Sequence, residues 1–162
     1  AAAEGQVCTV ANDNDPTQVV ISGHREAIER AVALVKDFGI KRGMLLPVSA
    51  PFHCLLMQPA ADAMAEALGK TPPGALRVPV FANVTAAVAS DPAEVQRLLV
   101  EQVTGRVRWR ESAIAMRDAG VESFVELGGK VVGPMITRSA GPDVAVTSVV
   151  TMADIEELAK SL

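Results

Sequence analysis

The sequence predicts an α/β fold, made of a partial ferredoxin-like β-β-α-β unit and part of a mostly parallel sheet. Two observations lead to this prediction. Strand-like apolar runs and amphipathic helical patterns alternate along most of the chain, which is typical of parallel sheets with helical connections. The first elements follow the order strand, strand, helix, strand, which lacks only the first strand and helix of the split βαβ motif. We expect a small subdomain over residues 1–46 and the larger part over residues 47–162.

The predicted small subdomain begins with a hairpin. Residues 7–11 and 18–22 are strand-like and flank the polar stretch 12–17, which indicates a wide loop. An amphipathic helix follows over residues 25–38, and residues 44–48 are apolar enough for a buried strand. Because the first strand and helix of the motif would precede this chain, we expect it to be the carboxyl-terminal part of a longer protein.

The larger part alternates helical and strand patterns. Asp91 precedes Pro92, and this pair is a typical N-cap and first helical residue. The expected helices and strands, in chain order, are helix 56–68, strand 78–83, helix 92–103, helix 109–119, strand 123–127, helix 130–138, strand 144–149 and helix 153–162.

Composition restricts the class of protein. The 162 residues are 49% hydrophobic but only 3% aromatic, so the core must be aliphatic and base stacking on nucleic acids is not expected. A formal charge of −4 also argues against binding to nucleic acid. Cys8 and Cys54 form no disulfide framework and no zinc-like cluster, which favours a reducing cytoplasm and no metal. No apolar run reaches the roughly 18 residues of a membrane span, so we expect no membrane association.

His53 is the candidate for acid–base chemistry. It lies in the proline-bracketed loop Pro47–Cys54, between the predicted strand 44–48 and the predicted helix 56–68. Sites of open α/β sheets gather at the carboxyl ends of strands, and an imidazole can accept and return a proton near neutral pH. The alternative is a partly buried histidine bonded to backbone. Cys54 is a poor partner for a dyad, because adjacent residues in an extended segment point to opposite sides.

Five motifs together resemble the malonyl-CoA:acyl-carrier-protein transacylases of bacterial fatty-acid synthesis, over about residues 5–135. In chain order they are A-N-D-N-D-P-T-Q-V-V-I-S-G-H, S-A-P-F-H-C-L-L-M-x-P-A, F-A-N-V-T, L-L-V-E-Q-V-T-x-x-V-x-W and V-E-L-G-G-K-V-V. The resemblance implies an α/β-hydrolase-like core for residues 47–162. It also implies a serine nucleophile in a G-H-S-x-G elbow and an arginine for the acyl carboxylate, both in an amino-terminal half. No G-x-S-x-G occurs in these 162 residues.

The resemblance assigns roles to three residues. His53 corresponds to the general base, and Gln102 to the residue whose backbone carbonyl orients that imidazole. Without the resemblance, Gln102 would be an ordinary glutamine on a helix surface. Phe52 corresponds to a position where phenylalanine accompanies malonyl selection and serine accompanies methylmalonyl selection; the alternative is that Phe52 only packs the loop.

Carboxamide side chains are the remaining candidates for substrate binding. Asn12, Asn14 and Gln18 belong to a polar loop that approaches the active-site cleft in the family, where amides can bind an acyl carbonyl or a pantetheine amide. Equally, such residues are common in turns that are purely structural. Asn83, at the end of a predicted strand, is expected to line the cleft or to cap the turn.

Two basic features invite weaker interpretations. Arg106, Arg108 and Arg110 would share one face of an extended segment and could attract acidic carrier protein or coenzyme A phosphates, although a solvated charged face is the usual outcome. The G-G-K stretch that begins at Gly128 lacks the proline of the family's usual G-P-G-K. It weakly resembles a phosphate-cradling turn.

The function implied is transfer of a malonyl group from malonyl-CoA to the phosphopantetheine thiol of acyl carrier protein by a ping-pong acyl-serine mechanism. This chain would supply the base, the missing amino-terminal half would supply the serine, and no cofactor is implied. Two alternatives stay open: a noncatalytic fragment or carrier-docking module, and an acyltransferase of polyketide type.

Overall fold

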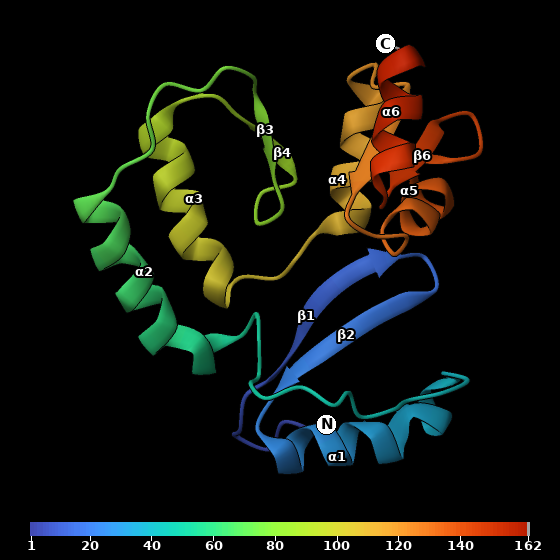
Figure 1. Ribbon diagram of the computed structural model, residues 1–162. Helices are drawn as coiled ribbons and strands as arrows, with labels where there is room; N and C mark the ends of the chain where they lie inside the picture. Colours follow the sequence, from blue (N-terminus) through green and yellow to red (C-terminus); the bar gives the residue numbers. More distant parts are fainter. Residues whose placement is uncertain (162) are drawn as a thin grey trace.

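In this computed structural model, which describes residues 1–161, the strands form three two-stranded sheets (Figure 1). β1 (Cys8–Asp15) pairs with β2 (Gln18–Gly23), and β3 (Val80–Ala82) pairs with β4 (Ala87–Ala89), both antiparallel. β5 (Ser123–Leu127) and β6 (Ala145–Val149) form the parallel pair. The chain is therefore α/β, as predicted, but its strands do not join into one sheet.

The helices match most of the predicted amphipathic segments. In chain order they are α1 (Arg25–Leu34), the 3-10 helices η1 (Val35–Phe38) and η2 (Leu55–Met57), α2 (Gln58–Lys70), α3 (Pro92–Thr104), α4 (Trp109–Asp118), α5 (Gly133–Ala140) and α6 (Met152–Ser161). The predicted cap is confirmed, because Asp91 Oδ1 accepts a 2.9 Å hydrogen bond from the Glu94 amide. None of the helices within residues 1–161 is both long and apolar enough to cross a membrane.

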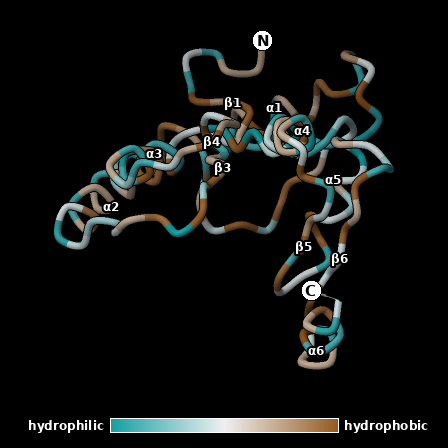
Figure 2. Tube along the Cα trace, turned by 90° about the horizontal axis from the view of Figure 1, so that it is seen from above, coloured by the Kyte–Doolittle hydropathy of each residue, from teal (hydrophilic) through white to brown (hydrophobic). Residues whose placement is uncertain are grey.

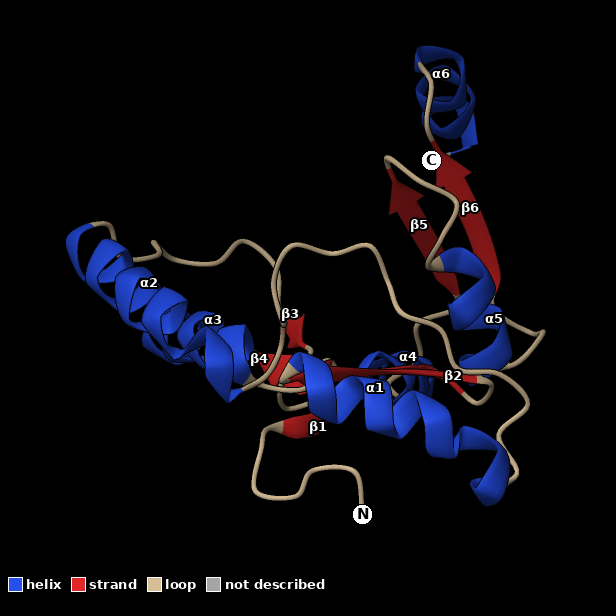
Figure 3. Cartoon of the chain, turned by 90° about the horizontal axis from the view of Figure 1, so that it is seen from below, coloured by secondary structure: helices blue, strands red, loops and turns tan. Residues whose placement is uncertain are grey.

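The main apolar core lies between α4, α5 and the β5–β6 pair. Phe124 and Ile136 are its largest buried members, and Trp109 packs against it from the first turn of α4. Figure 2 shows hydrophobic residues along β5 and β6. In Figure 3 these two strands and α6 project away from the rest of the molecule. A second interface joins α2 to α3 and buries Ala61 and Leu98.

The predicted strand over residues 44–48 is wrong. The segment is unpaired, its apolar side chains are exposed, and the Val48 amide donates to the Leu46 carbonyl at 2.9 Å rather than to a neighbouring strand. A strand needs hydrogen-bonding neighbours, and no other strand of the described residues lies beside this one. Of the predicted ferredoxin-like β-β-α-β unit, the structure therefore contains only β1, β2 and α1.

The predicted wide polar loop over residues 12–17 is also wrong. β1 continues to Asp15, and only Pro16 and Thr17 separate it from β2. The ladder contains two irregularities, which fall between Val10 and Asn12 and between Asp13 and Asp15. A polar run can continue as a strand here because its carboxylates are paired with arginines elsewhere in the fold, as described below.

The predicted mostly parallel sheet is wrong for a related reason. The strand expected over residues 78–83 turns back through Thr85 and Ala86 into β4, so it forms a hairpin instead of a crossover. Ala86 has a φ of +53° and its amide donates to the Ala82 carbonyl at 2.8 Å. The turn contains no glycine, so the sequence lacked the usual hairpin signal.

Candidate active site around His53

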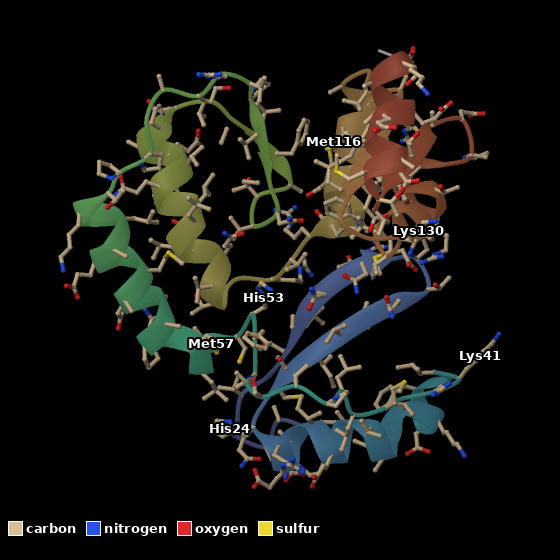
Figure 4. The ribbon with its side chains drawn as sticks, in the orientation of Figure 1. His24, Lys41, His53, Met57, Met116 and Lys130 are labelled. Carbon is tan, nitrogen blue, oxygen red and sulfur yellow. The ribbon has the colours of Figure 1, made fainter. Side chains whose placement is uncertain are left out.

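His53 lies where the loop before α2 meets the carboxyl-terminal end of α3 (Figure 4). Its backbone φ is +57°, a left-handed conformation that is uncommon for a residue with a side chain. The adjacent Cys54 is buried, and its Sγ lies 3.1 Å from the Pro51 carbonyl oxygen. Cys54 therefore anchors the loop, as expected of a structural cysteine, while His53 is only partly buried and can meet a substrate.

Two backbone carbonyls hold the imidazole at one nitrogen. Nδ1 of His53 lies 3.0 Å from the Gln102 oxygen and 3.2 Å from the Gly105 oxygen. Because both neighbours are acceptors, Nδ1 must carry the hydrogen and donate it to them. The neutral ring then has its lone pair on Nε2, the nitrogen that can take a proton from a substrate or nucleophile.

The helix end explains why these carbonyls are available. The last carbonyls of an α-helix lack intrahelical partners. In α3, the Glu101 oxygen accepts the Gly105 amide at 2.9 Å, whereas the Gln102 oxygen is left for His53. The carboxyl end of a helix also carries partial negative charge, which stabilises the positive charge that an imidazole acquires on taking a proton. This arrangement suits a general base.

The predicted carboxamide residues of the β1–β2 hairpin lie at different distances from His53. Asn12 forms an isolated bridge with Val107, two residues beyond the Gly105 carbonyl that contacts His53. Asn14 and Gln18 lie farther along, next to the turn, where Asn14 Nδ2 donates to Gln18 Oε1 at 3.2 Å. The structure thus brings Asn12 into the region of His53, whereas Asn14 and Gln18 bind each other. Phe52 is 47% exposed beside His53.

Asn83 follows β3 and faces the end of α3. Its backbone oxygen accepts a 3.2 Å hydrogen bond from the Arg108 amide. Together with Gln102 and apolar residues of β3 and α3, it lines a cavity of about 100 Å³. Its side-chain oxygen is buried and has no hydrogen-bond partner among residues 1–161. Asn83 therefore caps this turn by its backbone and leaves a free polar atom near the site.

Sequence reasoning missed two ion pairs that hold β1, each between a buried aspartate and a partly exposed arginine. Asp13 pairs with Arg110 of α4 at 2.7 Å, and Asp15 pairs with Arg138 of α5 at 2.7 Å. Burial alone would raise the pKa of Asp15, but hydrogen bonds from Arg138 and Thr17 outweigh it and hold the pKa below its usual value. The alternation of these aspartates with Asn12 and Asn14 could have placed both on one face of a strand, but it does not identify their arginine partners.

Glu126 is the other missed residue, and it corrects the phosphate-cradle interpretation of the G-G-K stretch. Its carboxylate accepts the amides of Val131 at 2.7 Å, Val132 at 3.0 Å and Gly133 at 2.9 Å. Burial alone would raise the pKa of Glu126, but these three bonds outweigh it and lower the pKa. The amides that would cradle a phosphate at the start of α5 are therefore already occupied.

The arginine row is also corrected. Only Val107 pairs as a strand residue, and Trp109 already begins α4, so the three guanidinium groups do not share one extended face. Arg106 and Arg108 both bind Glu111 and lower its pKa, chiefly through the hydrogen bond from Arg108, while Arg110 binds Asp13. These charges hold elements of the fold together.

The chain is similar to known proteins over most of its length. A family model described as acyl transferase domain matches residues 2–153. The malonyl CoA-acyl carrier protein transacylase of Salmonella typhimurium is 46% identical over 137 residues, which cover 84% of this chain and 44% of that protein. The chain spans about half the length of the curated relatives that it matches.

Solved structures of related proteins are also similar to this chain. The acyl-carrier-protein-S-malonyltransferase of Bartonella henselae superimposes with a TM-score of 0.92 and 45% identity over 99% of this chain and 51% of that one. The malonyl-transacylase PlMCAT, solved with AntF, a type II PKS acyl-carrier protein, has a TM-score of 0.93 and 34% identity over 99% of this chain and 52% of that one. Within residues 1–161, no group of three or more His, Cys, Asp or Glu side chains is placed to hold a metal ion.

Proposed function

Because this chain belongs to the acyl transferase domain family, we propose that its His53 is the general base for transfer of a malonyl group from malonyl-CoA to the phosphopantetheine thiol of acyl carrier protein. The Nδ1 contacts to two carbonyls carry this proposal. They leave Nε2 free to accept a proton, and the relatives with this sequence pattern are malonyl transacylases. The pathway served is fatty-acid biosynthesis.

The reaction has two half-reactions that use His53 alike. In the first, Nε2 takes the proton of a serine hydroxyl as its oxygen attacks the malonyl thioester carbonyl, and coenzyme A leaves as the thiol after His53 returns the proton. In the second, Nε2 takes the proton of the carrier's phosphopantetheine thiol, whose sulfur attacks the malonyl-serine ester. The serine oxygen then regains the proton. No cofactor beyond these substrates takes part.

The serine, the arginine for the malonyl carboxylate and the oxyanion donors belong, in this proposal, to the part of the relatives that this chain does not match. Within the chain, Phe52 borders the acyl group beside His53. Asn12 and Asn83 offer carboxamides near the same helix end, whereas Asn14 and Gln18 support the hairpin turn through their mutual bond.

One observation favours a second pathway for the same chemistry. A structural relative was solved with a type II PKS acyl-carrier protein, and 99% of this chain superimposes on it. Polyketide biosynthesis is therefore the second candidate, and relative transfer rates to fatty-acid and polyketide carrier proteins distinguish the two.

Malonyl transfer to acyl carrier protein tests the proposal. It is measured with the chain alone and with a reconstituted enzyme, in which the chain is combined with the unmatched part of a relative. We expect no turnover by the chain alone, because its 162 residues contain no G-x-S-x-G serine, and transfer by the reconstituted enzyme. Turnover by the chain alone at the rate of an intact relative would overturn the proposal. Assembly without transfer would favour a noncatalytic module.

A further inference from the structure

Gly105 ends α3 with an extended backbone, at φ −83° and ψ 152°, a conformation that any residue can adopt. Its carbonyl oxygen lies 3.2 Å from Nδ1 of His53, beside the Gln102 oxygen at 3.0 Å. The Nδ1–H is thus shared between a carbonyl inside the helix and a carbonyl just beyond it. Two acceptors restrict rotation of the ring more than one acceptor does.

The requirement for glycine at this position is steric. A Cβ atom on Gly105 would lie 2.8 Å from the backbone oxygen of Glu101 and 2.8 Å from Cγ2 of Val84. The valine methyl can yield, but the helix carbonyl cannot, because it accepts the Gly105 amide itself. Any side chain would therefore push the Gly105 peptide away from α3, together with the carbonyl that faces His53.

The chain beyond Gly105 has little freedom to absorb such a shift. The Val107 amide donates to the Ala11 carbonyl at 2.8 Å, and the Val107 oxygen accepts the Asp13 amide at 2.8 Å. The Arg108 amide donates to the Asn83 carbonyl at 3.2 Å. Because β1 and the β3–β4 turn both fix this segment, a displacement at Gly105 has to be taken up next to His53.

We propose that Gly105 is a second positioning residue for His53, whose carbonyl shares the Nδ1 proton and whose missing side chain keeps that carbonyl in place. The importance of this role for catalysis rests on the proposed function. The positioning itself is a property of this chain and is measurable without any transfer activity.

The test is the tautomer of His53 in the folded chain, measured by nitrogen NMR of the imidazole. His24 is an internal reference, because its Nδ1 accepts the Val7 amide at 2.9 Å and its hydrogen must therefore be on Nε2. We expect the opposite tautomer, with hydrogen on Nδ1, for His53. Gly105→Ala should lower the ratio of the Nδ1–H to the Nε2–H form of His53 by about 2-fold to 10-fold, the effect of weakening one hydrogen bond, and should leave His24 unchanged.

Gly74→Ala is the matched control, since a Cβ at Gly74 meets no atom within 4 Å. It should leave both histidines unchanged. A folded Gly105→Ala chain with the same His53 tautomer ratio as the unsubstituted chain would overturn the proposal.

A second measurement needs no substitution and applies even where Gly105→Ala does not fold. Carbonyl carbons of glycine and glutamine are labelled with carbon-13, and their resonances are followed while His53 titrates. The Gly105 resonance should move together with that of Gln102, whereas the distant Gly74 resonance should not. Movement of the Gln102 carbonyl alone would refute the role of Gly105, whether or not malonyl transfer is ever observed.

Discussion

His53 combines a strained backbone with a well-held side chain. A left-handed conformation costs a non-glycine residue on the order of 1–2 kcal/mol, and here it turns the ring toward the end of α3. Hydrogen bonds at Nδ1 and the buried Cys54 beside it offset that cost. Such strain is typical of functional sites, where the surrounding structure holds one reactive group in place.

The substitution Phe52→Ser tests whether Phe52 selects the acyl group. A ring beside the reacting carbon leaves little room for an α-methyl branch, and one methyl group in a pocket is worth roughly 1–3 kcal/mol. In the reconstituted enzyme, we expect the ratio of kcat/KM for methylmalonyl-CoA to that for malonyl-CoA to rise by about 10-fold or more. Phe38→Ser, at an exposed phenylalanine of η1, is the control. An unchanged ratio in an active Phe52→Ser enzyme would show that Phe52 only packs the loop.

At the scale of single residues, the sequence indicated a contact that the structure shows where a distinctive motif contains the residue. The S-A-P-F-H-C and E-Q-V-T segments indicated His53 and Gln102, and the structure places the Gln102 carbonyl next to the ring. Their catalytic roles stay predictions. Asp15 and Glu126 were missed because their partners, Arg138 and a turn of backbone amides, are visible only in three dimensions.

Among the elements, β1 is held in place by charge. Asp15 has no exposed side-chain surface and bonds Arg138 of α5, more than a hundred residues away in sequence. Asp15→Asn removes the charge at constant volume and should lower the free energy of unfolding by about 1–3 kcal/mol. Denaturant unfolding at neutral pH measures this. Asp118→Asn is the control, because the partner of Asp118 is its sequence neighbour Arg117 and both side chains are exposed; it should change the free energy of unfolding little. Equal losses of stability in the two variants would contradict this account of β1.

The lowered pKa values of the Asp15 and Glu126 carboxyl groups predict how stability depends on pH. The pKa of Asp15 is lowered from an ordinary 3.8 and that of Glu126 from an ordinary 4.5. A carboxyl group whose folded-state pKa is depressed contributes stability above its unfolded pKa and loses it as the pH falls through the folded pKa. The free energy of unfolding should therefore fall as the pH is lowered from about 5. Asp15→Asn should make this dependence shallower; an unchanged slope would contradict it.

Helices and strands could be predicted from the sequence where the signal lies within the element itself. Helix α3, with Asp91 and Pro92 at its start, and β5, with its alternation, could be predicted within a residue or two. The segment over residues 44–48 has an apolar strand pattern but no strand beside it, and β4 follows a turn without glycine. Pairing partners are distant in sequence, so patterns alone did not determine these sheets.

For the whole molecule, the exposed apolar surface is the prominent feature. Leu45 is 50% exposed and Leu127 is 75% exposed, although both belong to apolar segments. The parallel β5–β6 pair presents one face to solvent, whereas parallel strands are ordinarily covered on both faces. Large exposed apolar areas favour association.

We therefore expect the isolated chain to bind a hydrophobic dye or to self-associate. Dye fluorescence and light scattering measure these properties, and the double substitution Leu45→Asp with Leu127→Asp should reduce both. Lys36→Asp, on η1, is a control that leaves the apolar surface intact. A monodisperse monomer that melts cooperatively and binds no dye would contradict this prediction and would establish the chain as an autonomous domain.

The most direct test of the central claim, that His53 is a base held by the end of α3, is single-turnover malonyl transfer in the reconstituted enzyme. His53→Ala should slow both acylation of the serine and transfer to the carrier by about 10² to 10⁴-fold, the usual contribution of a general base. Gln102→Ala should have a far smaller effect, because the backbone carbonyl that binds Nδ1 remains. A folded His53→Ala enzyme with unchanged rates, or a Gln102→Ala enzyme as impaired as His53→Ala, would contradict the claim.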